Sequence, residues 1–166
     1  MATSFNLPIE RFFYRIEEDR DFFRYHNLDA SLAMQLATER AVHYLHDAID
    51  RMMMDGMPDI DFTDIDDKLL EFNVDLTTRE IFILSSLMYE FYLAKDIAKL
   101  KTYNVNYTNT ELKVFDPSNA RTSFKAMYDG VCLQNEKLLD TYRNTDRLTG
   151  AFKGIDFASY DEEEDA

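Results

Sequence analysis

The chain has 166 residues, 46% of them hydrophobic, and this composition predicts a folded domain with a sizeable core. Four glycines and three prolines are too few for the many tight turns of a β-sandwich or barrel, so long helices are favoured. The formal net charge of −14 opposes binding to phosphate backbones, which argues against an ordinary DNA- or RNA-binding protein.

The first predicted helix runs from about Pro8 to His26, with Pro8 in the first turn, where its missing N–H costs nothing. A second helix is predicted from Ala30 to Asp55, with Asp29 as its N-terminal cap. Its apolar residues recur at spacings of three and four and form one stripe: Met34, Ala37, Ala41, Leu45, Ala48 and Met52.

The acidic segment 57–75 is predicted to be a connection with one short turn of helix near Leu69. Thr77 and Glu80 then match a capping box, in which a hydroxyl and a carboxylate satisfy free backbone N–H groups at a helix start. The helix behind this box, residues 78–101, is apolar nearly all round and is expected to be the most buried one.

In segment 103–115, apolar and polar residues alternate weakly, and we predict a loose hairpin or a loop. A last long helix follows, capped by Asp116 or Ser118 and ending near Asn144.

These elements predict an all-α fold, a bundle of about four long helices with an extended C-terminal tail and a possible small β-hairpin. Residues 1–145 form the bundle domain, and residues 146–166 form a docking tail with an acidic end. The large apolar residues of this tail either complete the core or lie on a neighbour's sheet edge or groove. The candidate partner-binding residues are Arg147, Leu148, Phe152, Ile155, Phe157 and Tyr160.

Four potential metal ligands share one side of the second helix, namely Glu39, His43, His46 and Asp50. They could hold a transition metal if another helix supplied ligands, or they could form the solvated face of an amphipathic helix. Di-metal bundles use two Glu-x-x-His motifs, and this chain has none. The aspartates of segment 59–67 lack the glycine and the terminal glutamate of an EF-hand, so we predict a solvated loop and no metal or cofactor.

Nothing in the sequence indicates an enzyme. Cys132, the single cysteine, lies in a helical pattern without an evident base beside it, and it excludes an internal disulfide. Phosphate-binding loops and the Gly-x-Ser-x-Gly elbow are absent. The N-terminal residues do not match a signal peptide, and no stretch approaches the roughly 18 apolar residues of a membrane span. We expect a protein made in the cytosol that acts by binding other proteins and has no membrane partner.

The layout resembles that of the head–tail connector (adaptor) proteins of tailed bacteriophages. The segments that carry the resemblance are Asp19–Tyr25, Phe72–Thr77 before the Leu-Met-Tyr helix, the turn Asp116–Ala120, and Tyr142–Gly150 after the last helix. The resemblance implies a structural virion protein of the neck, assembled in the host cytoplasm into a ring of about twelve copies. The implied partners are other copies of the chain, the portal protein and a tail-side neck or stopper protein. DNA would pass through an acidic channel that repels phosphates and does not bind them specifically.

Two other functions fit parts of the sequence. An acidic DNA mimic that occupies the basic groove of a nucleic-acid enzyme would account for the net charge, and it would act as a monomer or dimer. A metal-dependent helical-bundle enzyme would use the Glu39 to Asp50 set.

Overall fold

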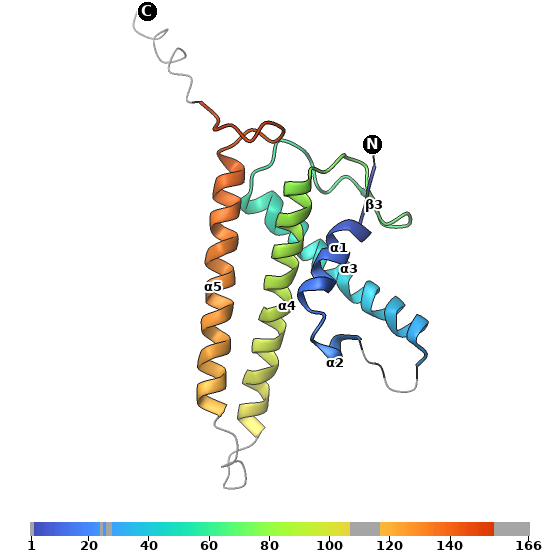
Figure 1. Ribbon diagram of the computed structural model, residues 1–166, viewed down its shortest axis with the longest axis vertical. Helices are drawn as coiled ribbons and strands as arrows, with labels where there is room; N and C mark the ends of the chain where they lie inside the picture. Colours follow the sequence, from blue (N-terminus) through green and yellow to red (C-terminus); the bar gives the residue numbers. More distant parts are fainter. Residues whose placement is uncertain (1, 24, 26–27, 107–116, 155–166) are drawn as a thin grey trace, which may run out of the picture.

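The computed structural model describes residues 2–23, 25, 28–106 and 117–154, without the side chains of residues 20–21, 99–106 and 117–121. Three long helices dominate it: α3 (Ala30–Asp55), α4 (Thr78–Asn106) and α5 (Pro117–Arg143). In Figure 1, α4 and α5 lie side by side and run in opposite directions, while α3 crosses α4 at an angle. The short helix α1 (Asn6–Arg15) packs against both α4 and α3. None of the described helices is long and apolar enough to span a membrane.

The mainly helical character predicted from the sequence is confirmed. The structure has three long helices, one helix of 10 residues and one of 4 among the described residues, so four long helices are not found. It also contains a three-stranded antiparallel sheet of very short strands.

Helix α3 has the predicted bounds. The side chain of Asp29 accepts a hydrogen bond from the backbone N–H of Leu32 at 2.8 Å, as an N-terminal cap does. The predicted stripe is buried from Ala37 to Met52. Met34 is the exception, with 51% of its surface exposed, because this end of α3 extends beyond the helices that cover the rest of the stripe.

The single helix predicted from Pro8 to His26 is wrong. Helix α1 ends at Arg15, and a separate turn of helix, α2 (Arg20–Phe23), follows. The side chain of Asp19 accepts hydrogen bonds from the backbone N–H of Phe22, at 3.3 Å, and from the hydroxyl of Tyr92. The break brings the rings of Phe12 and Phe22 to 5.8 Å, whereas ten residues of continuous helix span about 15 Å. Aromatic packing therefore outweighs the continuation of the helix.

The turn of helix predicted near Leu69 is also wrong, because this segment forms a β-hairpin. Its strands are β2 (Ile65–Asp66) and β3 (Glu71–Phe72), and β1 (Thr3–Ser4) pairs with the other edge of β3. Phe72 of β3 is fully buried, and so are Phe5, which follows β1, and Phe62, which precedes β2. The rings of Phe5 and Phe72 meet edge to face at 4.9 Å, so the sheet is held by aromatic burial.

Helix α4 begins with the predicted capping box. The backbone N–H of Thr77 donates to the carboxylate of Glu80 at 2.6 Å, and the N–H of Glu80 donates to the hydroxyl of Thr77 at 3.3 Å. The following residues are nearly all buried, as expected for the central helix. The helix continues to Asn106, so the first part of the predicted hairpin or loop 103–115 is helical; the rest lies outside the described residues.

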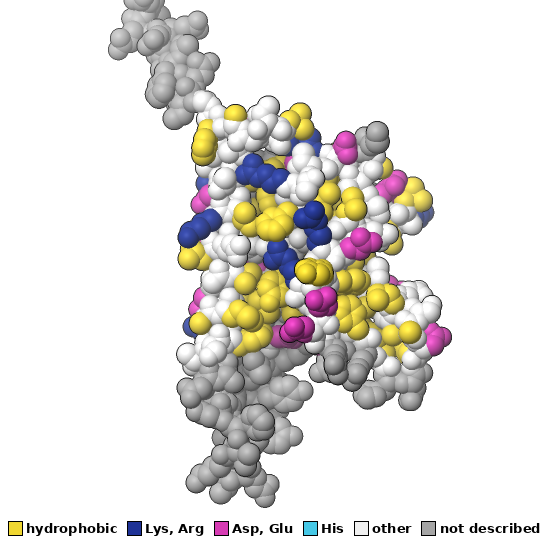
Figure 2. Space-filling model, viewed as in Figure 1, with side chains coloured by type: hydrophobic (Ala, Val, Ile, Leu, Met, Phe, Trp, Pro, Cys, Tyr) yellow, Lys and Arg dark blue, Asp and Glu magenta, His cyan; other side chains and the backbone are white. Residues whose placement is uncertain are grey.

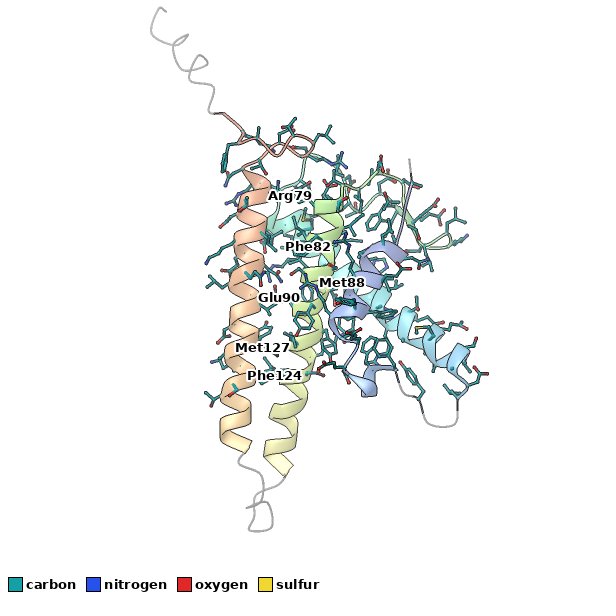
Figure 3. All side chains as sticks on the ribbon, in the orientation of Figure 1. Arg79, Phe82, Met88, Glu90, Phe124 and Met127 are labelled. Atoms are coloured by element: carbon teal, nitrogen blue, oxygen red, sulfur yellow. The ribbon has the colours of Figure 1, made fainter. Side chains whose placement is uncertain are left out.

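A buried polar network joins α5 to α4 and α3. Asn135 donates to the carboxylate of Glu90 at 2.8 Å and accepts from the hydroxyl of Ser86 at 2.7 Å. Arg51 of α3 reaches the same Glu90 at 2.7 Å. Figure 3 shows Glu90 on α4 at the level where α4 and α5 face each other. The network fixes the position of α5 along α4, because any sliding would leave these groups unpaired in the interior.

We expect Asn135→Ala to lower the free energy of unfolding by about 1–3 kcal/mol, because Ser86 and Glu90 would lose buried hydrogen bonds. Chemical denaturation followed by far-UV circular dichroism measures this loss. The exposed neighbour Gln134 provides the control, since Gln134→Ala should change stability by less than about 0.5 kcal/mol. Equal effects of the two variants would contradict the role given to the network.

Candidate functional site

Three of the six predicted partner-binding residues lie in the described part of the tail: Arg147, Leu148 and Phe152. Ile155, Phe157 and Tyr160 lie outside the described residues. The three belong to one short loop that follows α5 at the end of the molecule where α4 begins (Figure 1).

Backbone hydrogen bonds close this loop, residues 145–152, at its base. Thr145 and Phe152 form an antiparallel bridge, and the N–H of Asp146 donates to the carbonyl of Ala151 at 2.7 Å. The carboxylate of Asp146 accepts from the N–H and the hydroxyl of Thr149 at 2.7 and 2.6 Å. These hydrogen bonds lower the pKa of Asp146, because they favour its charged form. Gly150, with φ of +70°, supplies the left-handed backbone that completes the turn.

A buried ion pair fastens the loop to the helices. The guanidinium of Arg147 donates to the carboxylate of Glu80 at 2.6 and 3.1 Å and also to the carbonyl of Asp75. The hydroxyl of Tyr142 donates to the same carboxylate at 2.6 Å. Glu80 has no exposed surface, so the capping-box glutamate is also the partner of the loop.

The charge of Glu80 is stabilised in this position. Burial alone raises the pKa of a carboxyl group, but the hydrogen bonds from Arg147, Tyr142 and Thr77 outweigh burial, and the pKa of Glu80 lies below its usual value. Burial and the hydrogen bond to Glu80 raise the pKa of Tyr142, which therefore remains a hydrogen-bond donor. Figure 3 shows Arg79 beside this site, where it donates to the hydroxyl of Thr145 at 2.7 Å.

Leu148 and Phe152, by contrast, point outward. Their exposed fractions are 77% and 80%, the highest among the large apolar side chains of the described residues. Lys153, just after the loop, forms a further ion pair with the rest of the chain, since its ammonium lies 2.9 Å from a carboxylate oxygen of Asp59. Arg147 thus acts within the chain and holds the loop, while Leu148 and Phe152 are the side chains available to a partner.

Comparison with known proteins adds no family to this description. No family model, curated protein or solved structure matches the chain. The function of the chain must therefore be argued from its own residues.

The four candidate metal ligands on α3 do not converge. Glu39, His43 and Asp50 are exposed, and His46 lies 3.3 Å from Asp67 and next to the ring of Phe5. No group of three or more potential ligands is close enough to hold a metal ion in the part of the chain that the structure describes. Aspartates of the acidic loop form hydrogen bonds within the loop. The carboxylate of Asp61, for example, accepts from the N–H and the hydroxyl of Thr63 at 2.8 and 2.5 Å.

Cys132 is half-buried on α5. Burial raises the pKa of its thiol, and the nearby charge of Glu90 raises it further, although a hydrogen bond with Tyr128 lowers it. This environment disfavours the thiolate that nucleophilic chemistry needs.

Proposed function

We propose that the chain is a structural virion subunit, a head–tail connector that forms a ring under the portal protein and joins the capsid to the tail. The observation that carries this proposal is the exposed pair Leu148 and Phe152 on a loop held by the buried Arg147–Glu80 pair. A fixed loop with two large apolar side chains loses little conformational entropy on binding, as suits an interface. The resemblance of the layout to connector proteins supports the same assignment.

In this proposal the partners are other copies of the chain, the portal protein and a tail-side neck protein, and the site of action is the neck of the virion. The net charge of −14 then has a mechanical use, because carboxylates along a channel would let DNA pass without binding the wall. The chain needs no reaction centre for this role.

Native mass spectrometry and negative-stain electron microscopy of the purified chain over a range of concentrations test the proposal. We expect closed rings of about twelve copies. A monomer or dimer at every concentration, alone and with portal rings, would contradict the connector function and favour the acidic DNA mimic.

We expect the double variant Leu148→Ser/Phe152→Ser to weaken assembly by about tenfold or more, because each buried apolar side chain contributes about 1.5–3 kcal/mol. The free energy of unfolding should change by less than about 0.5 kcal/mol, since both side chains are exposed in the single chain. Leu69→Ser removes another exposed leucine, far from the loop in the sequence, and serves as the control. Unchanged assembly of the double variant would rule out this pair as the contact.

A further inference from the structure

A groove lies between α1 and α4, two elements that lie next to each other in Figure 1. Its volume is about 460 Å³. The residues that line it are Glu10, Arg11, Tyr14 and Arg15 of α1 and Phe82 and Ser85 of α4. Tyr14 is 75% exposed, so an aromatic ring stands free beside the groove.

The groove contains two arginines, Arg11 and Arg15. The guanidinium of Arg15 lies 5.2 Å from the centre of the Phe82 ring, and one of its nitrogens donates to the hydroxyl of Ser86 at 3.4 Å. Neither Arg11 nor Arg15 forms an ion pair with any carboxylate of the described residues. Burial lowers the pKa of Arg15; the nearby Tyr89 raises it, and the like charge of Arg11 lowers it. An anion between the two guanidinium groups would relieve this repulsion.

The surface around the groove is unusual for so acidic a chain. Figure 2 shows Lys and Arg side chains gathered among apolar side chains in the middle of this face, with acidic side chains below and beside them. A partner that fits must therefore offer carboxylates together with aromatic or aliphatic groups. The net charge of −14 disfavours nucleic acid as the partner, because the negative chain repels its phosphates.

Segment 155–166 of the chain has this chemistry. It contains six carboxylate side chains and no lysine or arginine, and it begins with the apolar residues Ile155, Phe157 and Tyr160. Carboxylates pair with arginine through strong charge-assisted hydrogen bonds, and the aromatic rings match Phe82 and Tyr14. Twelve residues reach up to about 40 Å when extended, which is enough to cross to an adjacent molecule.

The donor segment and the acceptor groove belong to different parts of the chain's surface. The described chain ends at Gly154, after α5 and the loop that follows it, and Lys153 is held there by Asp59, whereas the groove lies between α1 and α4. A contact between two different surfaces of identical subunits is heterologous, and such contacts form a ring when the rotation from one copy to the next closes. We propose that the acidic segment 155–166 of one copy docks in the α1/α4 groove of the next copy, with its carboxylates on Arg11 and Arg15. This inference rests on the proposed assembly and names its acceptor surface.

Fluorescence anisotropy of a labelled peptide of residues 155–166 tests the acceptor. The receiving protein is the full chain with the five acidic residues 161–165 changed to their amides, so that its own segment does not compete. We expect binding that weakens with salt and falls at least tenfold in Arg11→Glu/Arg15→Glu. Lys125→Glu/Lys137→Glu on the exposed face of α5 makes the same change in net charge and should bind as the parent does. Equal binding by both double variants would overturn the proposal.

Disulfide trapping decides whether the segment binds a neighbour. One chain carries Tyr14→Cys, another carries Ser159→Cys, and both carry Cys132→Ser. We expect a disulfide between the two chains after mixing, and its loss when Arg11→Glu/Arg15→Glu is added to the Tyr14→Cys chain. A chain with both new cysteines that forms only an internal disulfide at every concentration would contradict docking on a neighbour. Rings that persist in Arg11→Glu/Arg15→Glu would refute this docking while leaving the connector function standing. A wild-type chain that stays a monomer or dimer, both alone and with portal rings, would refute both.

Discussion

Glu80→Ala is expected to lower the free energy of unfolding by about 3–5 kcal/mol, because it leaves the guanidinium of Arg147, whose side chain is only 18% exposed, without its charge partner. The same change removes the glutamate of the capping box and the acceptor of the Tyr142 hydroxyl. Chemical denaturation followed by circular dichroism gives the change in stability. Hydrogen exchange at residues 145–153 should show faster exchange than in the parent, since Arg147 no longer fastens the loop.

A loss this large approaches the total stability of many domains, so Glu80→Gln provides a milder second variant that keeps the side-chain volume. Glu39→Ala on the exposed face of α3 is the matched control and should cost less than about 0.5 kcal/mol. If Glu80→Ala were no more destabilising than Glu39→Ala, the buried pair would not hold the loop.

The same site predicts a dependence of stability on pH. The pKa of Glu80 is lower in the folded chain than its ordinary value of 4.5. Its contribution is therefore fully present above about pH 4.5 and is lost as the pH falls through the lower folded-state pKa. Between neutral pH and pH 3, the parent chain should lose more stability than Glu80→Gln, which has no carboxylate to protonate at this position.

Phe12→Ala is the second change with a large expected effect, a loss of about 3–5 kcal/mol in the free energy of unfolding. Phe12 has no exposed surface, and its ring contacts those of Phe22, Tyr44 and Tyr92, at 5.7 to 6.0 Å between centres. These rings come from α2, α3 and α4, so the variant leaves a cavity where four helices meet. Thermal unfolding and denaturant titration both measure the loss.

Tyr14 of the same helix gives the control for Phe12, because its ring is mostly exposed. Tyr14→Ala should leave the free energy of unfolding within about 0.5 kcal/mol of the parent value. A small effect of Phe12→Ala would mean that the aromatic cluster does not attach α1 to the long helices, and the break after Arg15 would then need another cause.

The elements that could be predicted from the sequence are those whose signals are local. The bounds of α3 and its Asp29 cap, and the capping box of Thr77 and Glu80, depend on contacts within three residues and on one helical period. The burial of α4 follows from apolar residues on all its sides. At this level the sequence predicts a mainly helical protein with an apolar C-terminal tail, but it leaves open whether the apolar residues of the tail complete the core or meet a partner.

The other features depend on contacts between residues that are far apart in the chain. Arg147 and Glu80 are 67 positions apart, and no pattern near either residue marks them as partners. The hydroxyl of Thr3 accepts from the N–H of Leu76, 73 positions away, where the strands are too short to show an alternating pattern. The end of α1 was set in the same way by aromatic rings from other helices. Local propensities fix where a helix can form, but long-range burial decides where it stops and which charged side chains find a partner.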